Sequence, residues 1–83
     1  MNIRYTERFL CTAKKLPQAI QNDLIRVVNQ IIHPAIRDPL HVYPLDGRFR
    51  GLSALSINFA YQAIVISSED SIIFLDVALR VII

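Results

Sequence analysis

The fold is decided by residues 41–83, which read HVYPLDGRFRG (41–51), LSALSI (52–57), NFAYQAIVIS (58–67) and SEDSIIFLDVALRVII (68–83). Residues 52–57 are half apolar, whereas residues 63–66 and 72–75 are continuous apolar runs rich in β-branched side chains. Continuous runs of this kind are typical of strands that are covered on both faces. Asn58 and the polar residues 67–71 separate the runs at a spacing that suits antiparallel hairpins. The pattern therefore predicts three successive strands.

The chain before this stretch carries a helical pattern. Residues 2–5 read as a short opening strand, and Thr6 offers an N-cap hydroxyl for a helix that runs to about Leu16. Pro17 interrupts that helix and suits the first turn of a second helix, which ends near Ile32. Apolar side chains recur at helical spacing at Phe9, Leu10, Ala13 and Leu16, and again at Ile20, Leu24, Val27, Val28 and Ile31. The two helices are expected to form a hairpin whose apolar stripes pack on the strands, giving an α+β fold.

A basic segment lies just before the predicted strands. The Asp-Gly pair ending at Gly47 is a turn signal, and Gly51 is a second point of backbone freedom. On a strand, Arg48 and Arg50 would share one side and Phe49 would take the other. Such an arginine pair can bind phosphate, and plain solvent exposure of both arginines is the alternative.

Length and composition indicate one domain spanning residues 1–83. The apolar fraction is 53% and the charged fraction 19%, so disorder is not expected, and apolar surface left over in so small a chain suggests a partner that covers it. With a single cysteine, Cys11, the chain cannot form an internal disulfide, and its two histidines give no zinc spacing. It also lacks a glycine-rich phosphate loop, so we expect neither a metal nor a cofactor.

The expected cellular compartment and the expected charge of a partner follow from the same composition. The N-terminus has no apolar signal region and no apolar run is long enough to cross a bilayer, so a cytoplasmic protein without a membrane partner is expected. The net charge of +2 is a weak indication of an anionic partner. Residues 1–40 hold six basic and three acidic groups, whereas residues 41–83 hold three basic and four acidic groups. The strand half is therefore slightly acidic.

The order of these features resembles that of the RelE/ParE superfamily of type II toxins. The resemblance covers nearly the whole chain and is carried by Phe9, residues 14–17, Ile20, Ile31, Pro34, residues 44–51, Ser56-Ile57, residues 61–64 and residues 73–77. It implies a short N-terminal strand and an α-helical hairpin packed on a small antiparallel sheet, and a cognate antitoxin that wraps around the toxin. It also implies one of two activities. RelE-like members cleave ribosome-bound mRNA, whereas ParE-like members act against DNA gyrase.

The resemblance also suggests which residues form a site. Arg80 falls where a family arginine that stabilises phosphate charge lies, and Arg48 and Arg50 are the other candidates for holding RNA phosphate. Cleavage needs a base, an acid and cations, because a ribose 2′-hydroxyl must lose a proton and attack the neighbouring phosphorus. His41, Tyr43 and Tyr61 could carry that proton, although a surface loop position for His41 and a core position for Tyr61 are the structural alternatives.

Two departures from the family pattern keep a second function open. Family nucleases carry an arginine after the tyrosine where this chain has Gln62, and a later tyrosine of the family is missing after Arg80. The alternative to an mRNA interferase is therefore an interaction protein without nuclease activity. It would be either a ParE-like gyrase inhibitor or a toxin-like module that binds an antitoxin.

Overall fold

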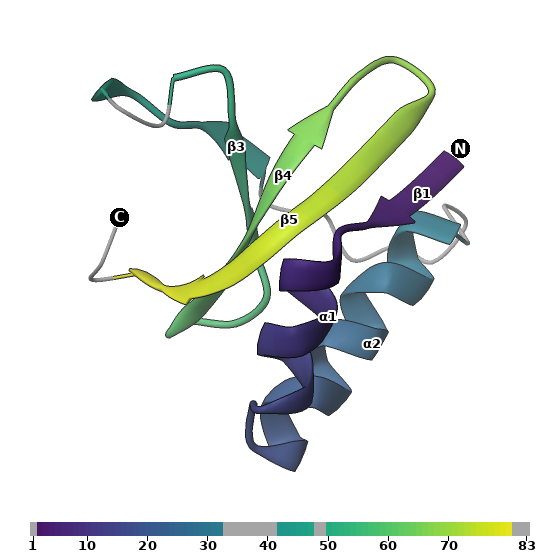
Figure 1. Cartoon of the computed structure of the whole chain (residues 1–83), viewed down its shortest axis with the longest axis vertical. Helices are drawn as coiled ribbons and strands as arrows, with labels where there is room; N and C mark the ends of the chain where they lie inside the picture. Colours follow the sequence, from purple (N-terminus) through teal and green to yellow (C-terminus); the bar gives the residue numbers. More distant parts are fainter. Residues whose placement is uncertain (1, 33–41, 48–49, 81–83) are drawn as a thin grey trace.

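The computed structural model describes residues 2–32, 42–47 and 50–80, with side chains from residue 44 onward in the second of these ranges. The elements are β1 (Asn2–Tyr5), α1 (Glu7–Lys14), α2 (Gln18–Ile32), β2 (Val42–Pro44), β3 (Ser53–Ser56), β4 (Tyr61–Ser67) and β5 (Ser71–Leu79). The strands form one sheet in the order β1-β5-β4-β3-β2 (Figure 1). The β1–β5 pair is parallel and the other pairs are antiparallel. The predicted α+β architecture is confirmed, with β4 as the central strand. The sheet was expected to be antiparallel and is mixed, because β1 runs parallel to β5.

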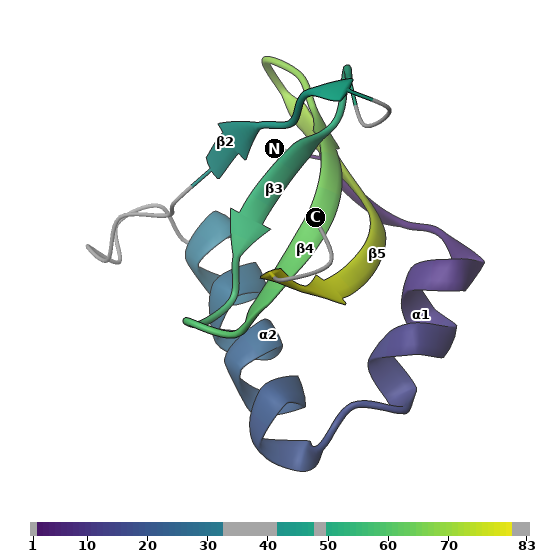
Figure 2. The same cartoon turned by 90° about the vertical axis from the view of Figure 1, so that its left-hand side faces the viewer.

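Both helices begin where the sequence predicts. The Thr6 hydroxyl accepts the backbone N–H of Phe9 at 3.1 Å, which is the N-cap geometry of a helix. The carbonyl of Pro17 accepts the first helical N–H groups of α2, from Ile20 and Gln21, each at 3.0 Å. Because proline has no N–H to lose, it is well suited to this position. Figure 2 shows α1 and α2 joined by a short connection and diverging toward the sheet.

One apolar cluster joins the helices to one face of the sheet. Its buried members are Phe9, Leu24 and Val27 from the helices, Ile57 from the β3–β4 turn, and Leu55, Ala63, Val65, Ile72, Phe74 and Val77 from the strands. The rings of Tyr5, Phe9 and Phe74 stand 5.1–5.5 Å apart and tie β1, α1 and β5 together. Burial of these side chains stabilises the fold by about 1.5–3 kcal/mol for each large one.

A β-bulge in β5 changes which side chains face that core. Phe74 pairs with Val65, but the next residue of β4, Ile64, pairs with Asp76, so Leu75 is the extra residue. Before the bulge Ile72 and Phe74 face the helices, and after it Val77 does. Without the extra residue, alternation would have turned positions 76, 78 and 80 toward the helices. The bulge therefore places Ala78 and the following Arg80 on the opposite face, which we call the outer face.

Thr6 also holds the bulge in place. Its hydroxyl donates to the carbonyl oxygen of Leu75 at 3.0 Å, while its backbone N–H donates to the carbonyl of Phe74 at 3.0 Å. One side chain thus begins α1 and satisfies the carbonyl that the bulge displaces from the ladder.

The hairpin between β2 and β3 contains the predicted turn. Gly47 and Gly51 both have positive φ, 67° and 91°, which glycine adopts without strain. Arg50 therefore lies in the turn and not on a strand, so the prediction that strand alternation sets the direction of its side chain does not hold. Arg48 and Phe49, the other residues of that expectation, lie outside the described residues.

No helix in the described ranges is long and apolar enough to span a bilayer.

Candidate functional site

The outer face of the sheet carries a row of polar side chains at one end. Ser56 of β3 pairs with Gln62 of β4, and Gln62 pairs with Ala78 of β5. Gln62 is only 2% exposed, and Ser56 is half-buried. Arg80 follows β5 directly, and its Nη2 donates to the hydroxyl of Ser56. The sheet thus brings Arg80, Ser56 and Gln62 together from three strands.

The guanidinium of Arg80 has unused hydrogen-bonding capacity. Its Nε is buried and has no hydrogen-bond partner. The salt bridges of the described ranges are Arg8–Asp76 and Arg26–Asp23, so no described carboxylate neutralises Arg80. Leaving a buried donor unsatisfied costs about 1–3 kcal/mol, and more for a charged group. Arg80 as a whole is only half-buried, so a bound anion would neutralise its charge from the accessible side of the side chain, and phosphate matches the planar fork of arginine.

The turn between β3 and β4 borders this arginine. The backbone N–H of Arg80 donates to the carbonyl of Ala60 at 2.9 Å, and the Ser56 hydroxyl donates to the carbonyl of Asn58 at 3.3 Å. The Asn58 side chain accepts the N–H groups of Ala60 and Tyr61 at 2.8 and 2.9 Å. Its amide then donates to Asp23 of α2 at 3.0 Å. The turn is therefore fixed between the arginine on one side and α2 on the other.

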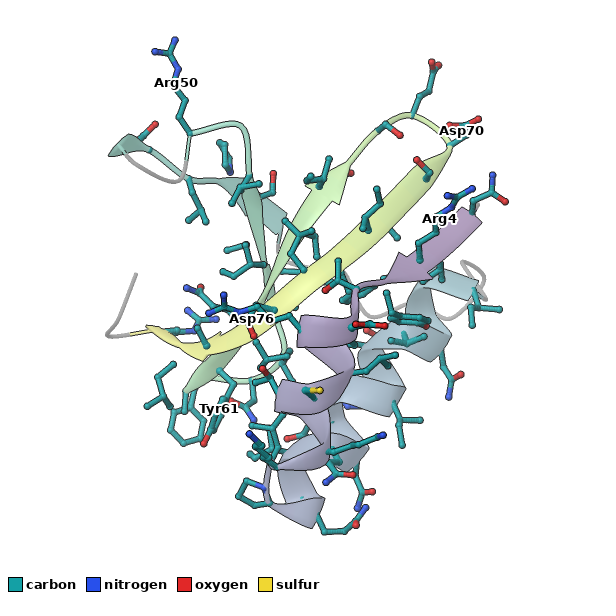
Figure 3. All side chains as sticks on the ribbon, viewed as in Figure 1. Arg4, Arg50, Tyr61, Asp70 and Asp76 are labelled. Carbon is teal, nitrogen blue, oxygen red and sulfur yellow. The ribbon has the colours of Figure 1, made fainter. Side chains whose placement is uncertain are left out.

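The structure does not bring the other sequence-predicted residues to Arg80. Tyr61 packs against the core cluster, on the face opposite to Gln62, so its ring and the Arg80 side chain lie on different sides of the sheet. Arg50 is exposed, and Figure 3 shows its side chain pointing away from the sheet at the top of the view, whereas Tyr61 lies near the lower end of the sheet. His41 and Arg48 lie outside the described residues, as does the side chain of Tyr43.

The arrangement can hold an anion, and the described residues around it supply no proton carrier. The contacts described for Arg80 come from the Ser56 hydroxyl and the Ala60 carbonyl, neither of which titrates near neutral pH. Over the described ranges, no group of three or more histidine, cysteine or acidic side chains could hold a metal ion. Anion binding is therefore the chemistry that the geometry supports directly.

Sequence reasoning missed Ser56 and the Asn58 turn as parts of the site. The sequence gives Ser56 no site role, although Ser56-Ile57 is part of the resemblance, because its contact with Arg80 spans 24 residues of sequence. A local signal did exist for Asn58, since asparagine favours turns in which its side chain accepts nearby backbone N–H groups.

A second surface feature lies between the two helices. A groove of about 210 Å³ is lined by Tyr5, Phe9, Leu24, Ile25, Val28 and Asn29. It adjoins a second hollow, because both are lined by Leu24 and Ile25. Tyr5, Leu10 and Ile25 line these hollows and are 42%, 45% and 57% exposed. The interhelical groove is thus an apolar surface that faces solvent.

Comparison with solved structures identifies the fold. YafQ from E. coli strain BL21(DE3) superposes with a TM-score of 0.76 at 15% identity, covering 98% of this chain and 94% of that one. The RelB-RelE antitoxin-toxin complex from Methanococcus jannaschii gives 0.72 at 17% identity, covering 93% and 89%. The toxin-antitoxin complex RelBE2 from Mycobacterium tuberculosis gives 0.67 at 23% identity, covering 95% and 96%. No family model matches the sequence, and no significant match was found among curated proteins. The chain therefore has the fold of the RelE-like toxins, and the resemblance seen in the sequence is confirmed at the level of the fold.

Proposed function

We propose that this protein is the toxin component of a type II toxin–antitoxin pair, RelE-like in its action, and that it binds mRNA phosphate through Arg80. The observation that carries the proposal is the half-buried Arg80 on the outer face, whose guanidinium is paired with no described carboxylate. The fold supports it, because the structures that share the fold include toxins in complex with antitoxins.

Arg80 would act on the charge that develops during cleavage. When the 2′-hydroxyl attacks in line, negative charge builds on the phosphoryl oxygens, and a fixed guanidinium stabilises that charge without reorganising. The bond to Ser56 holds the arginine on the sheet, and the accessible part of its side chain would meet the phosphate. Proton transfer would fall to His41 or to groups of the ribosome, because the described neighbours of Arg80 do not supply it.

We propose a cognate antitoxin as the partner and the cytoplasm as the compartment. The interhelical groove supports this, since it and the adjoining hollow expose Tyr5, Leu10 and Ile25 on one continuous surface. Covering such a groove with an apolar helix face is a common mode of peptide recognition. The antitoxin would then hide apolar surface that the free toxin leaves in water.

Cleavage of mRNA in a purified translation system, with and without ribosomes, tests the proposal. We expect ribosome-dependent cuts by the wild type and a loss of roughly 100- to 1,000-fold in Arg80→Ala, as for removal of one oxyanion donor. Arg4→Ala is the matched control, because Arg4 is exposed on β1 and its removal changes the net charge equally. Intact mRNA with folded wild-type protein would rule out the interferase. Equal loss of cleavage in both variants would show that Arg80 contributes only through the net charge of the protein.

One observation favours a second candidate, an interaction protein without nuclease activity. The central strand carries the neutral Gln62 beside Arg80, and the neighbouring Tyr61 packs against the core. A ParE-like gyrase inhibitor or a toxin-like module that binds an antitoxin would need no proton carrier here. Inhibition of gyrase supercoiling by the wild type, together with intact mRNA, would establish the gyrase form of this alternative. Antitoxin binding with neither effect would establish the binding module.

A further inference from the structure

The β3–β4 turn holds one large aromatic side chain out in solvent. Phe59 is 91% exposed, the largest exposure among the large apolar side chains that the structure describes. Single exposed apolar residues are common on proteins and carry no meaning alone. Phe59 differs in its surroundings, because the turn that carries it is bonded to three other parts of the chain.

These bonds remove the freedom that a turn of this kind usually has. Asn58 fixes the turn internally by accepting from Ala60 and Tyr61, and it reaches Asp23 of α2. Arg26 of α2 donates to the carbonyl of Ile57 at 3.4 Å, and the Ile57 side chain is buried in the core. The phenyl ring is therefore presented on a fixed backbone, and little further ordering would be needed when a partner binds it.

The same turn touches the arginine of the candidate site. The residue after Phe59, Ala60, accepts the backbone N–H of Arg80, and the residue before it, Asn58, accepts the hydroxyl that binds the Arg80 guanidinium. The exposed aromatic residue thus lies in a turn that is bonded to a cation without a described acidic partner. Proteins that bind single-stranded nucleic acid combine these two chemistries, with bases stacked on aromatic rings and phosphates held by cations.

We propose that Phe59 is a stacking platform for an unpaired nucleobase of single-stranded RNA whose adjacent phosphate is held by Arg80. The inference rests on the proposed RNA-binding function and adds a base contact to it. Stacking on a phenyl ring uses the face that every base has, so the contact adds affinity without selecting one base. It would also fix the register of the strand, because the ring and the arginine would each hold one part of the same nucleotide step.

The test compares two short single-stranded RNAs of the same length, one with all its bases and one with an abasic nucleotide in the middle, by fluorescence anisotropy. Both carry the same phosphates, so their difference in Kd isolates base stacking. We expect the wild type to bind the complete RNA about tenfold more tightly, within the range of about 5- to 150-fold that loss of one stacked base gives. Phe59→Leu is expected to abolish this difference and Phe59→Tyr to keep it. Because the side chain is exposed, neither change should disturb the core.

Arg80→Ala separates failure of this inference from failure of the proposed function. Loss of one phosphate contact should weaken the binding of both RNAs equally. It should also lower the slope of log Kd against log salt concentration by roughly the amount that one phosphate contact contributes. If Arg80→Ala weakens binding but Phe59→Leu behaves like the wild type, the stacking platform is refuted while the RNA-binding face stands. If neither RNA binds to the wild type, both are refuted. If Phe59→Leu impairs only co-purification with an antitoxin, the ring contacts protein and the inference is wrong.

Discussion

Replacing Thr6 by valine is expected to lower the free energy of unfolding by about 2 kcal/mol. Valine keeps the size and branching of threonine and removes the hydroxyl, which accepts from Phe9 N at 3.1 Å and donates to the Leu75 carbonyl at 3.0 Å. Loss of an N-cap costs about 1 kcal/mol. Loss of the bond to the bulge costs about another 1 kcal/mol, because the half-buried carbonyl is left without its donor.

Urea unfolding followed by circular dichroism measures this difference directly. In a chain of 83 residues, about 2 kcal/mol corresponds to a fall in Tm of roughly 8–16 °C. Thr6→Ser is the matched control, because it removes the methyl group and keeps both hydrogen bonds, and it should stay close to the wild type. If Thr6→Val and Thr6→Ser were equally stable, the hydroxyl would contribute nothing to the cap or the bulge, and the reasoning would be refuted.

Three further predictions concern other parts of the molecule. Asn58→Ala should lower the free energy of unfolding by about 2–3 kcal/mol, because two backbone N–H groups lose their acceptor and Asp23 loses one of its two partners. Urea unfolding would show the loss beside the exposed Asn22→Ala, and equal stability of the two variants would contradict the fixed turn. Arg8→Ala should change the free energy of unfolding by less than about 1 kcal/mol in the same urea assay, because its ion pair with Asp76 is largely exposed. A larger loss would show that this pair stabilises the fold more than surface pairs usually do. Ile25→Ser should weaken antitoxin binding about 10- to 100-fold, as loss of one buried apolar contact does. Calorimetry would measure the affinity with Ile66→Ser on the sheet as the control, and equal affinity of the two variants would exclude the interhelical groove as the docking surface.

The parts of the fold that were predictable rest on local signals. Thr6 and Pro17 mark helix starts through short-range geometry, and helical spacing of apolar residues predicts both stripes. The three strands were predicted from their apolar runs and the polar segments between them. These features need no knowledge of the rest of the chain, and the structure confirms them.

The candidate site was only partly predictable, because its geometry depends on contacts far apart in the sequence. The bulge at Leu75 decides the face of Arg80, and a bulge is set by the pairing of two strands. A trace of it exists in the sequence, since the alternation of Ile72 and Phe74 resumes one position out of phase at Val77. The sequence is compatible with both a core and a site role for Tyr61, and alternation with Gln62 places it on the core face.

The central claim is that the Arg80 guanidinium holds an RNA phosphate, and the Nε resonance of that arginine tests it most directly. In an NMR titration of nitrogen-15-labelled protein with short single-stranded RNA, the Nε resonance of Arg80 should shift as the guanidinium binds phosphate, because no described carboxylate neutralises its charge beforehand. Arg26, which is bonded to Ile57 and paired with Asp23, should shift little and serves as the internal control. A shift confined to Arg80 is the result we predict. RNA binding that leaves the Arg80 resonance unmoved would contradict the account.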